Sequence, residues 1–202
     1  MRARMGRRWH TYRVVRLLSL LIVAAGLDAA GSTSACAQNS GFDLAGNSVD
    51  PLKTAGGKVV VLVFVRTDCP VSNRYAPTIQ KLSAEHAGKA AFWLVYPSKA
   101  ESAESIRKHG REYGYRIPAL RDPQHLLVKE SQVEITPEVA VFDANRRLVY
   151  HGRIDNLYED IGRSRRVATT HELADAISGA LDGKSLAVEA THAVGCYISD
   201  LE

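Results

Sequence analysis

The feature that most constrains the fold is an uninterrupted apolar run, Val59–Val65, which leads through a short polar turn into Cys69 and Pro70. A run of this length, rich in valine, is typical of a strand that is buried on both faces of a sheet. We expect a helix to begin at Cys69 and Pro70. A thiol at that junction faces the free backbone N–H groups of the first helical turn, whose partial positive charge stabilises a thiolate. The sequence therefore predicts Cys69 as a nucleophile with a lowered pKa.

The first 37 residues have the organisation of a secretory signal peptide. A basic segment precedes a short apolar stretch, Leu17–Ala25, which is too short to anchor the chain stably in a bilayer. Ala35-Cys36-Ala37 follows as a cleavage pattern of small residues. We expect cleavage after Ala37, export to the periplasm or cell envelope, and no membrane attachment afterwards. A retained anchor and a lipoprotein acylated at Cys36 are the alternatives, and Thr33 disfavours the second because lipoprotein signals usually carry Leu there.

Net charge argues against a nucleic-acid partner. Six of the 26 basic residues and one of the 22 acidic residues lie before residue 38, which leaves 20 against 21 in the mature chain. The pI of about 9.0 therefore comes mostly from the export signal, and no basic surface of the kind that binds nucleic acid remains. Residues 38–202 are enough for one domain with a proper core, and 184–202 forms a tail without a clear pattern.

Strand and helix patterns alternate along the mature chain, which favours a sheet with helices on both faces. In the first half we expect a hairpin of 42–44 and 49–52, a strand over 58–65, a helix over 69–86 and a strand over 90–96. These are followed by a helix from 98 to 113 and a short helix over 122–129. The last elements are a hairpin of 139–142 and 148–150 and a helix that starts at 169–172 and ends at 183. The closing hairpin makes the sheet mixed, and the fold class is α/β.

Four local motifs occur in order along this pattern. They are Phe42-Asp43-Leu44 leading to Gly57-Lys58-Val59, Cys69 followed by Ala76-Pro77, Ile135-Thr136-Pro137, and Val141-Phe142-Asp143 leading to Gly152-Arg153-Ile154. Together they resemble the redoxin branch of the thioredoxin superfamily, which includes the alkyl hydroperoxide reductase and thiol-specific antioxidant type of peroxiredoxin and the exported thiol-disulfide oxidoreductases. The resemblance covers 42–181. It implies a thioredoxin-like fold, with a mixed central sheet flanked by helices and an N-terminal β-hairpin.

The resemblance also implies roles for individual residues. Cys69 stands at the place of the reactive cysteine, and the bond between Thr136 and Pro137 is expected to be cis, although Pro137 taken alone would be an ordinary trans residue at a strand start. The backbone of Thr136 would then lie beside Cys69 and pair with an extended partner peptide. Ser72 replaces the second cysteine of the dithiol members, so it donates a hydrogen bond to the thiolate or caps the helix. Arg66 replaces the threonine of peroxiredoxins, which disfavours a strict peroxidase mechanism.

Cys196 follows Gly195 near the C-terminus and allows three interpretations. The first is a small buried side chain in a tail strand, and the second is a resolving partner for Cys69. The third is a copper ligand together with Cys69 and His192, since thiolates and imidazole suit copper. Gly195 permits a close approach of the backbone. A tail that docks when oxidised and is released when reduced would give a redox cycle. The other histidines singled out are expected to be solvated: His86, His109, His125 and His171.

Three functional hypotheses follow. The first is an exported thiol-disulfide oxidoreductase in which Cys69 attacks and Cys196 resolves, with Ser72, Thr136 and Pro137 completing the site. The second is a peroxiredoxin-like thiol peroxidase with an antioxidant role. The third is a copper-binding or non-catalytic binding module of the same fold. Protein or small-molecule thiols and disulfides, and peroxides under the second hypothesis, are the expected partners, and no cofactor is expected.

Overall fold

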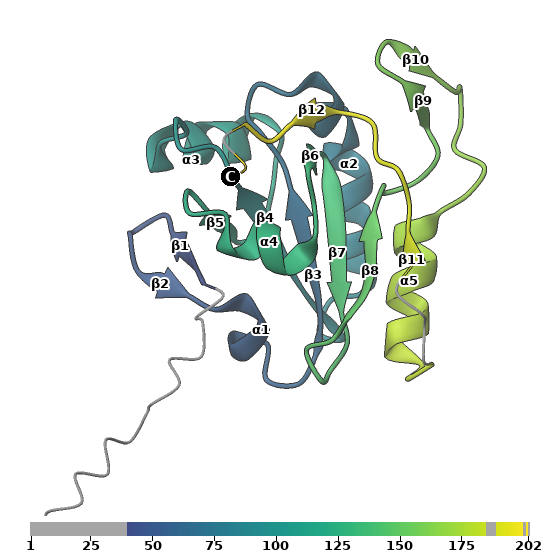
Figure 1. Ribbon diagram of the computed structural model, residues 1–202, viewed down its shortest axis with the longest axis horizontal. Helices are drawn as coiled ribbons and strands as arrows, with labels where there is room; N and C mark the ends of the chain where they lie inside the picture. The colour runs from purple at the N-terminus through teal and green to yellow at the C-terminus, as the bar shows by residue number, and fades with distance from the viewer. Residues whose placement is uncertain (1–39, 185–188, 200, 202) are drawn as a thin grey trace, which may run out of the picture. The chain divides into compact units, whose positions relative to one another are not determined.

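The protein is described by a computed structural model that covers residues 40–184, 189–199 and 201 (Figure 1). The predicted signal peptide, residues 1–37 with Cys36, lies outside the described residues. None of the helices in the described part of the chain has the length and apolar character that a membrane crossing requires.

An eight-stranded mixed sheet organises the described residues, in the order β11-β8-β7-β3-β4-β5-β1-β2 (Figure 1). The central strand β3 pairs in parallel with β4 and antiparallel with β7. The strands of this sheet are β1 (Gly41–Asp43), β2 (Ser48–Val49), β3 (Val59–Phe64), β4 (Ala90–Tyr96), β5 (Ala119–Arg121), β7 (Glu138–Phe142), β8 (Leu148–Gly152) and β11 (Glu189–Ala190). This arrangement confirms the predicted mixed sheet and its N-terminal hairpin.

Five helices and two small two-stranded sheets complete the described structure. The helices are α1 (Pro51–Thr54), α2 (Pro70–Glu85), α3 (Ala103–Glu112), α4 (Leu126–Ser131) and α5 (Glu172–Leu181). The small sheets pair β9 (Tyr158–Asp160) with β10 (Arg163–Ser164), and β6 (Ile135–Thr136) with β12 (Cys196–Tyr197). The tail that showed no sequence pattern thus contributes two short strands, one to each of two sheets.

The apolar run Val59–Val65 explains why helices cover both faces of the sheet. All six residues of β3 are buried, and successive side chains of a strand point to opposite faces. Val61 and Val63 pack in a core that includes buried residues of α2 and α5. Leu62 and Phe64 pack in a second core that includes residues of α1 and α4. Both faces of β3 therefore exclude water, as the sequence predicts.

Three helix starts differ from the sequence prediction, and one of them is that of α4, which begins at Leu126 instead of residue 122. Residues 51–54 form α1, although 51 and 52 were predicted as the end of a strand, because Asp50 caps the helix by accepting the Lys53 N–H at 3.0 Å. Helix α3 begins four to five residues later than the capping pattern at 98–101 indicated, with Ser102 as its N-cap. Glu101, the expected capping acid, instead accepts the N–H of Thr67 from the loop after β3, at 2.6 Å. The Glu101 carboxylate therefore makes a tertiary contact instead of capping α3.

Candidate active site

The reactive thiol predicted from the sequence lies at the start of α2. Cys69 is the N-cap residue of that helix and is completely buried, with 0% of its surface exposed. Pro70 occupies the first helical turn, where the absence of an N–H costs nothing. The sulfur of Cys69 lies 3.2 Å from the backbone oxygen of Thr136, to which the thiol donates. The end of the central strand and the start of the helix therefore hold the sulfur against β6.

Several donors surround this sulfur and decide its charge. Burial raises the pKa of the Cys69 thiol and is the largest single influence. Hydrogen bonds from the thiol of Cys196, the hydroxyl of Ser72 and the backbone N–H groups of Ser72 and Val71 act in the opposite direction, and the net pKa is lowered. The lowered pKa of Cys69 agrees with the sequence prediction, but the backbone N–H groups of the helix terminus are only one of the causes of the shift.

Ser72 takes the place that a second cysteine would have. Its side chain is completely buried, and its hydroxyl oxygen has no hydrogen-bond partner among the described residues while Cys69 is a thiol. A buried hydroxyl without a hydrogen-bond partner destabilises the folded protein. A thiolate at Cys69 would accept a hydrogen bond from the Ser72 hydroxyl and remove this cost. Ser72 therefore favours ionisation of the neighbouring sulfur, which is one of the two roles expected for it.

The tail brings the second cysteine to the first. Strand β12 pairs antiparallel with β6, so that Cys196 lies opposite Thr136 and Tyr197 opposite Ile135. The hydroxyl of Thr136 donates to the backbone oxygen of Cys196 at 3.2 Å. Both cysteines are free thiols. The tail is therefore docked while the cysteines are reduced, which differs from the predicted cycle in which reduction releases it.

The two thiols influence each other in opposite directions. Burial, the hydrogen bond that Cys196 donates to Cys69 and the negative charge of the Cys69 thiolate raise the pKa of Cys196 to about 11. The same hydrogen bond lowers the pKa of Cys69. When the pair loses one proton, the charge therefore resides on the buried sulfur, and Cys196 remains the proton donor beside it.

The peptide bond between Thr136 and Pro137 is cis, as the resemblance predicts. Both residues are buried, and they lie where β6 passes into β7. The carboxylate of Glu138 supports this corner by accepting the backbone N–H groups of Glu134 and Ile135, at 2.8 and 3.1 Å. The backbone of Thr136 thereby faces the sulfur of Cys69 on one side and β12 on the other.

A buried hydrogen-bond chain behind the site was not predicted from the sequence. His109 is only 2% exposed, and its Nε2 lies 2.7 Å from Oδ1 of Asn73. Asn73 donates from Nδ2 to the backbone oxygen of Thr67 at 3.2 Å, and Tyr96 donates to Nδ1 of His109 at 2.9 Å. This pattern corresponds to a neutral imidazole, and burial lowers the pKa of His109 accordingly. Helix α3 is thus tied to the loop that precedes Cys69.

The prediction that His109 and His125 are solvated is wrong. His125 is 3% exposed, and its Nε2 lies 3.0 Å from the backbone oxygen of Pro97. His86 is half-buried and His171 is exposed. The helical pattern around His109 contained one signal for its burial, since Ile106 lies three residues earlier on the same face.

Two arginines near the site have different roles. Arg66 pairs with Asp68 at 2.8 Å and donates to the backbone oxygen of Tyr197 at 3.5 Å, so it holds the tail strand. Its positive charge lowers the pKa of Cys196. Arg153 forms an ion pair with Glu172 of α5. Arg66 is therefore part of the site, and Arg153 belongs to the support of α5.

The three residues considered for copper do not come together. His192 is exposed and lines a surface cavity with Arg153 and Asn156, which contains neither cysteine. Within residues 40–184 and 189–199, no three His, Cys, Asp or Glu side chains are grouped closely enough to hold a metal ion. The proposed set of Cys69, Cys196 and His192 is therefore not assembled.

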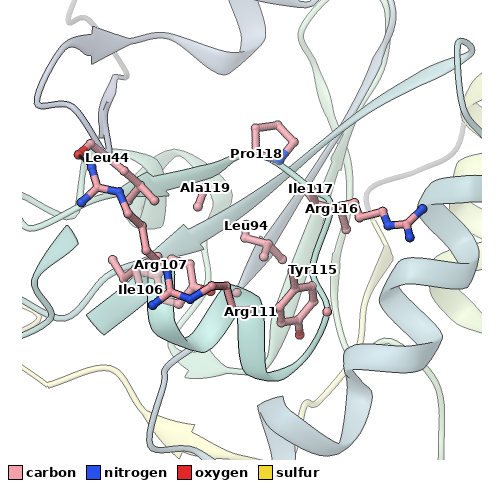
Figure 2. Close-up of a pocket in the computed structure, with 13 residues that line it drawn as sticks. Leu44, Leu94, Ile106, Arg107, Arg111, Tyr115, Arg116, Ile117, Pro118 and Ala119 are labelled. Carbon is pink, nitrogen blue, oxygen red and sulfur yellow. Dashed lines mark hydrogen bonds between the residues drawn. The ribbon is translucent and has the colours of Figure 1, made fainter. Parts of the chain in front are cut away.

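The reactive sulfur does not open into the cavity that adjoins α3. That cavity has a volume of about 560 Å³ and lies between α3 and strands β4 and β5. Figure 2 shows aliphatic side chains such as Leu94 and Ile106 along it, with Arg107 and Arg111 of α3 nearby. Neither cysteine lines it. Cys69, which has no exposed surface, is therefore not part of this cavity.

Comparisons with known proteins agree with this fold. The family model described as Redoxin matches residues 30–162. A hypothetical protein from Sinorhizobium meliloti has a TM-score of 0.67 at 24% identity, over 79% of this chain and 88% of that chain. An uncharacterized conserved protein from Geobacillus kaustophilus has a TM-score of 0.68 at 22% identity, over 79% and 86%.

A secreted disulfide oxidoreductase of Mycobacterium tuberculosis, described as homologous to DsbE of E. coli, has a TM-score of 0.50 at 18% identity, over 73% of this chain and 96% of that chain. At these identities the structural neighbours establish the fold, which is thioredoxin-like. No curated protein matches the sequence.

Proposed function

Because the chain belongs to the Redoxin family, we propose that it is an exported thiol-disulfide oxidoreductase in which Cys69 is the nucleophile and Cys196 the resolving cysteine. The observation that carries the proposal is the juxtaposition of the two thiols across β6 and β12, with a lowered pKa at one and a raised pKa at the other. A dithiol with one ionised and one protonated member is the arrangement that disulfide exchange requires.

The first step is attack of the Cys69 thiolate on a disulfide of the substrate. A new bond forms between the Cys69 sulfur and one substrate sulfur, and the second substrate sulfur leaves as a thiolate. The negative charge on Cys69 then disappears, together with the acceptor for the Cys196 thiol. Since both raise the pKa of Cys196, the pKa of Cys196 falls when the mixed disulfide has formed.

The second step is resolution by Cys196. Its proton passes to solvent or to the departing thiolate, and its sulfur attacks Cys69, so that the remaining substrate sulfur leaves. The substrate gains two electrons, and Cys69 and Cys196 become a disulfide. An external dithiol returns the pair to the reduced state. Ser72 stabilises the Cys69 thiolate in this scheme, and Thr136 and Pro137 line the site beside it.

The decisive experiment compares the wild type with Cys196→Ser in a disulfide-reduction assay. The variant should form a mixed disulfide at Cys69 and stop there, so that the adduct accumulates and turnover falls by at least tenfold. Cys69→Ser is the control and should form no adduct. Wild-type turnover by Cys196→Ser would contradict the role given to Cys196.

A thiol peroxidase is the second candidate, and the complete burial of Cys69 favours it, because a peroxide is the smallest oxidant that has to reach the sulfur. The thiolate would attack one peroxide oxygen to give a sulfenic acid and release hydroxide or an alkoxide. Cys196 would then condense with the sulfenic acid, with loss of water. Stopped-flow oxidation of the reduced protein tests this candidate, since a rate no greater than that of free cysteine would contradict it.

Export is the remaining part of the proposal. The arginine-rich segment, the apolar stretch and the small residues before residue 38 support a signal peptide that is cleaved after Ala37. A compartment outside the cytoplasm is oxidising and permits a stable disulfide between the two cysteines. Mass measurement of the secreted protein should give a chain that begins at Gln38.

A further inference from the structure

We propose that the tail segment, residues 189–199, occupies the groove in which an extended polypeptide disulfide would bind, so that a polypeptide substrate reaches Cys69 only after this segment has left. The inference rests on the proposed function and specifies its substrate class. Small disulfides need a smaller opening of the site than polypeptides do, so their reaction with Cys69 should depend less on departure of the tail.

The tail segment uses the backbone groups that a polypeptide substrate would need. Peptides commonly bind by adding a strand to a free sheet edge through main-chain hydrogen bonds. Here β12 is the strand paired with β6, and Cys196 lies opposite Thr136. The N–H of Ile198 extends the ladder by donating to the backbone oxygen of Glu134 at 2.9 Å. The edge beside the reactive sulfur is therefore already occupied by the chain itself.

The tail also occupies the position of a substrate cysteine. Its Cys196 lies opposite Thr136, whose backbone oxygen is 3.2 Å from the Cys69 sulfur, and Cys69 has no exposed surface while the tail is docked. A substrate strand that aligned its own disulfide with Cys69 would have to occupy the same space. Docking of the tail and docking of an extended substrate are therefore mutually exclusive.

Anchors on both sides of Cys196 hold the segment in place. Upstream, Thr191 Oγ1 lies 2.7 Å from the hydroxyl of Tyr150 and accepts the N–H of Arg153 at 3.1 Å. Downstream, Ile198 is 5% exposed and packs in the second core. Both strands of the tail are only two residues long, and a segment with so few main-chain hydrogen bonds opens at a lower free energy than the rest of the fold. The tail can therefore open while the central sheet stays folded.

Gly195 is the residue that makes this docking possible. A Cβ atom at Gly195 would lie 2.1 Å from the backbone oxygen of Thr136 and 2.7 Å from its carbonyl carbon. The obstacle is backbone, which cannot rotate away as a flexible side chain does. The φ angle of Gly195 lies outside the left-handed region, so alanine at this position opposes docking through the contact with Thr136 and not through backbone strain. Gly195→Ala should therefore oppose docking and leave the rest of the chain unchanged.

The test measures only the first chemical step, in a Cys196→Ser background that prevents resolution. We compare Cys196→Ser with Gly195→Ala/Cys196→Ser and follow formation of the mixed disulfide at Cys69, with insulin as the polypeptide disulfide and oxidised glutathione as the small one. Undocking should raise the rate with insulin at least tenfold and the rate with glutathione by less than threefold. The matched control is Gly110→Ala in the same background, because a Cβ there meets no atom within 4 Å, and both rates should stay unchanged.

Two further measurements keep the outcomes distinct. Amide hydrogen exchange at Ile198 should be faster in Gly195→Ala than in wild type, and Ile198→Ser, which removes the downstream anchor, should shift the insulin rate in the same direction. If insulin forms the mixed disulfide equally fast with Cys196→Ser and with Gly195→Ala/Cys196→Ser, while glutathione reacts with both, the inference is overturned. The proposed function is unaffected by that result. Failure of Cys196→Ser to react with either disulfide would overturn the proposed function, and the inference with it.

Discussion

At the scale of single residues, the charge of Cys69 is decided by side chains rather than by the helix alone. Burial in a fully enclosed site would by itself keep the proton on the sulfur. The hydroxyl of Ser72 and the thiol of Cys196 supply the donors that reverse this preference. Replacement of the usual second cysteine by serine therefore leaves a donor that stabilises the thiolate but cannot form a disulfide.

Ser72→Ala should raise the pKa of the Cys69 thiol, because one hydrogen bond to the thiolate is lost. A hydrogen bond to a charged group contributes about 1.5–3 kcal/mol, so we expect alkylation of Cys69 by iodoacetamide to slow by at least about tenfold at a pH below the pKa. The pH dependence of thiolate absorbance at 240 nm gives the direction of the shift.

Ser131→Ala is the matched control for this substitution. Ser131 is also completely buried, and its hydroxyl likewise has no partner among the described residues, but it lies at the end of α4. Its removal should leave the titration of Cys69 unchanged. A lowered pKa in Ser72→Ala, or the same shift in both variants, would contradict the role of Ser72.

At the scale of elements, the start of α4 shows how a buried acid can replace an ordinary cap. The N-cap residue His125 makes no side-chain cap bond. Asp122 instead accepts the N–H groups of Leu126 and Val128, each at 2.9 Å. Asp122 is only 1% exposed, and burial raises the pKa of its carboxyl to about 6 in spite of these donors. The helix is thus held by a group that titrates within an accessible pH range.

The stability of the fold should depend on pH through Asp122. A carboxyl whose pKa is raised from 3.8 to about 6 on folding stabilises the protein fully below the lower value, and this contribution is lost as the pH rises through the higher one. The free energy of unfolding of wild type should therefore fall between pH 4 and pH 7, relative to that of Asp122→Asn, by roughly 3 kcal/mol at most. Urea unfolding of both proteins across this range measures the difference, and parallel pH profiles would contradict it.

At the scale of the whole molecule, the two cysteines join the end of the central strand to the end of the chain. A disulfide between Cys69 and Cys196 closes a loop of more than a hundred residues. The chain-entropy model assigns about 4–5 kcal/mol to such a loop. Redox state and global stability are therefore coupled in the proposed function.

The oxidised protein should unfold at a higher urea concentration than the reduced protein, by an amount that corresponds to a few kcal/mol. Oxidation should have no such effect on Cys196→Ser, which serves as the control because it cannot close the loop. An identical unfolding midpoint for oxidised and reduced wild type would contradict the pairing of the two cysteines.

Local patterns were sufficient to predict most of the sheet and the place of Cys69 at a helix start. The valine run of β3 predicts a strand that is buried on both faces, and Pro70 after Cys69 predicts a helix start. Both patterns can be recognised from the sequence because they depend on neighbouring residues only. The same holds for the hairpin of β7 and β8. The cis bond before Pro137 was predicted only with the help of the family resemblance, since an isolated X-Pro bond is usually trans.

Contacts between distant segments decided the rest. Nothing near Glu101 in the sequence indicates that its carboxylate accepts the N–H of Thr67, and nothing near His109 indicates a hydrogen bond to Asn73. Strands of two residues, such as β6 and β12, have no periodicity that a sequence can display. The sequence by itself determined a central strand and an ionisable sulfur at the helix start. Only the tertiary structure decided that the tail pairs with β6 beside that sulfur, with Gly195 against Thr136, because the closeness of two backbones depends on the whole chain between them.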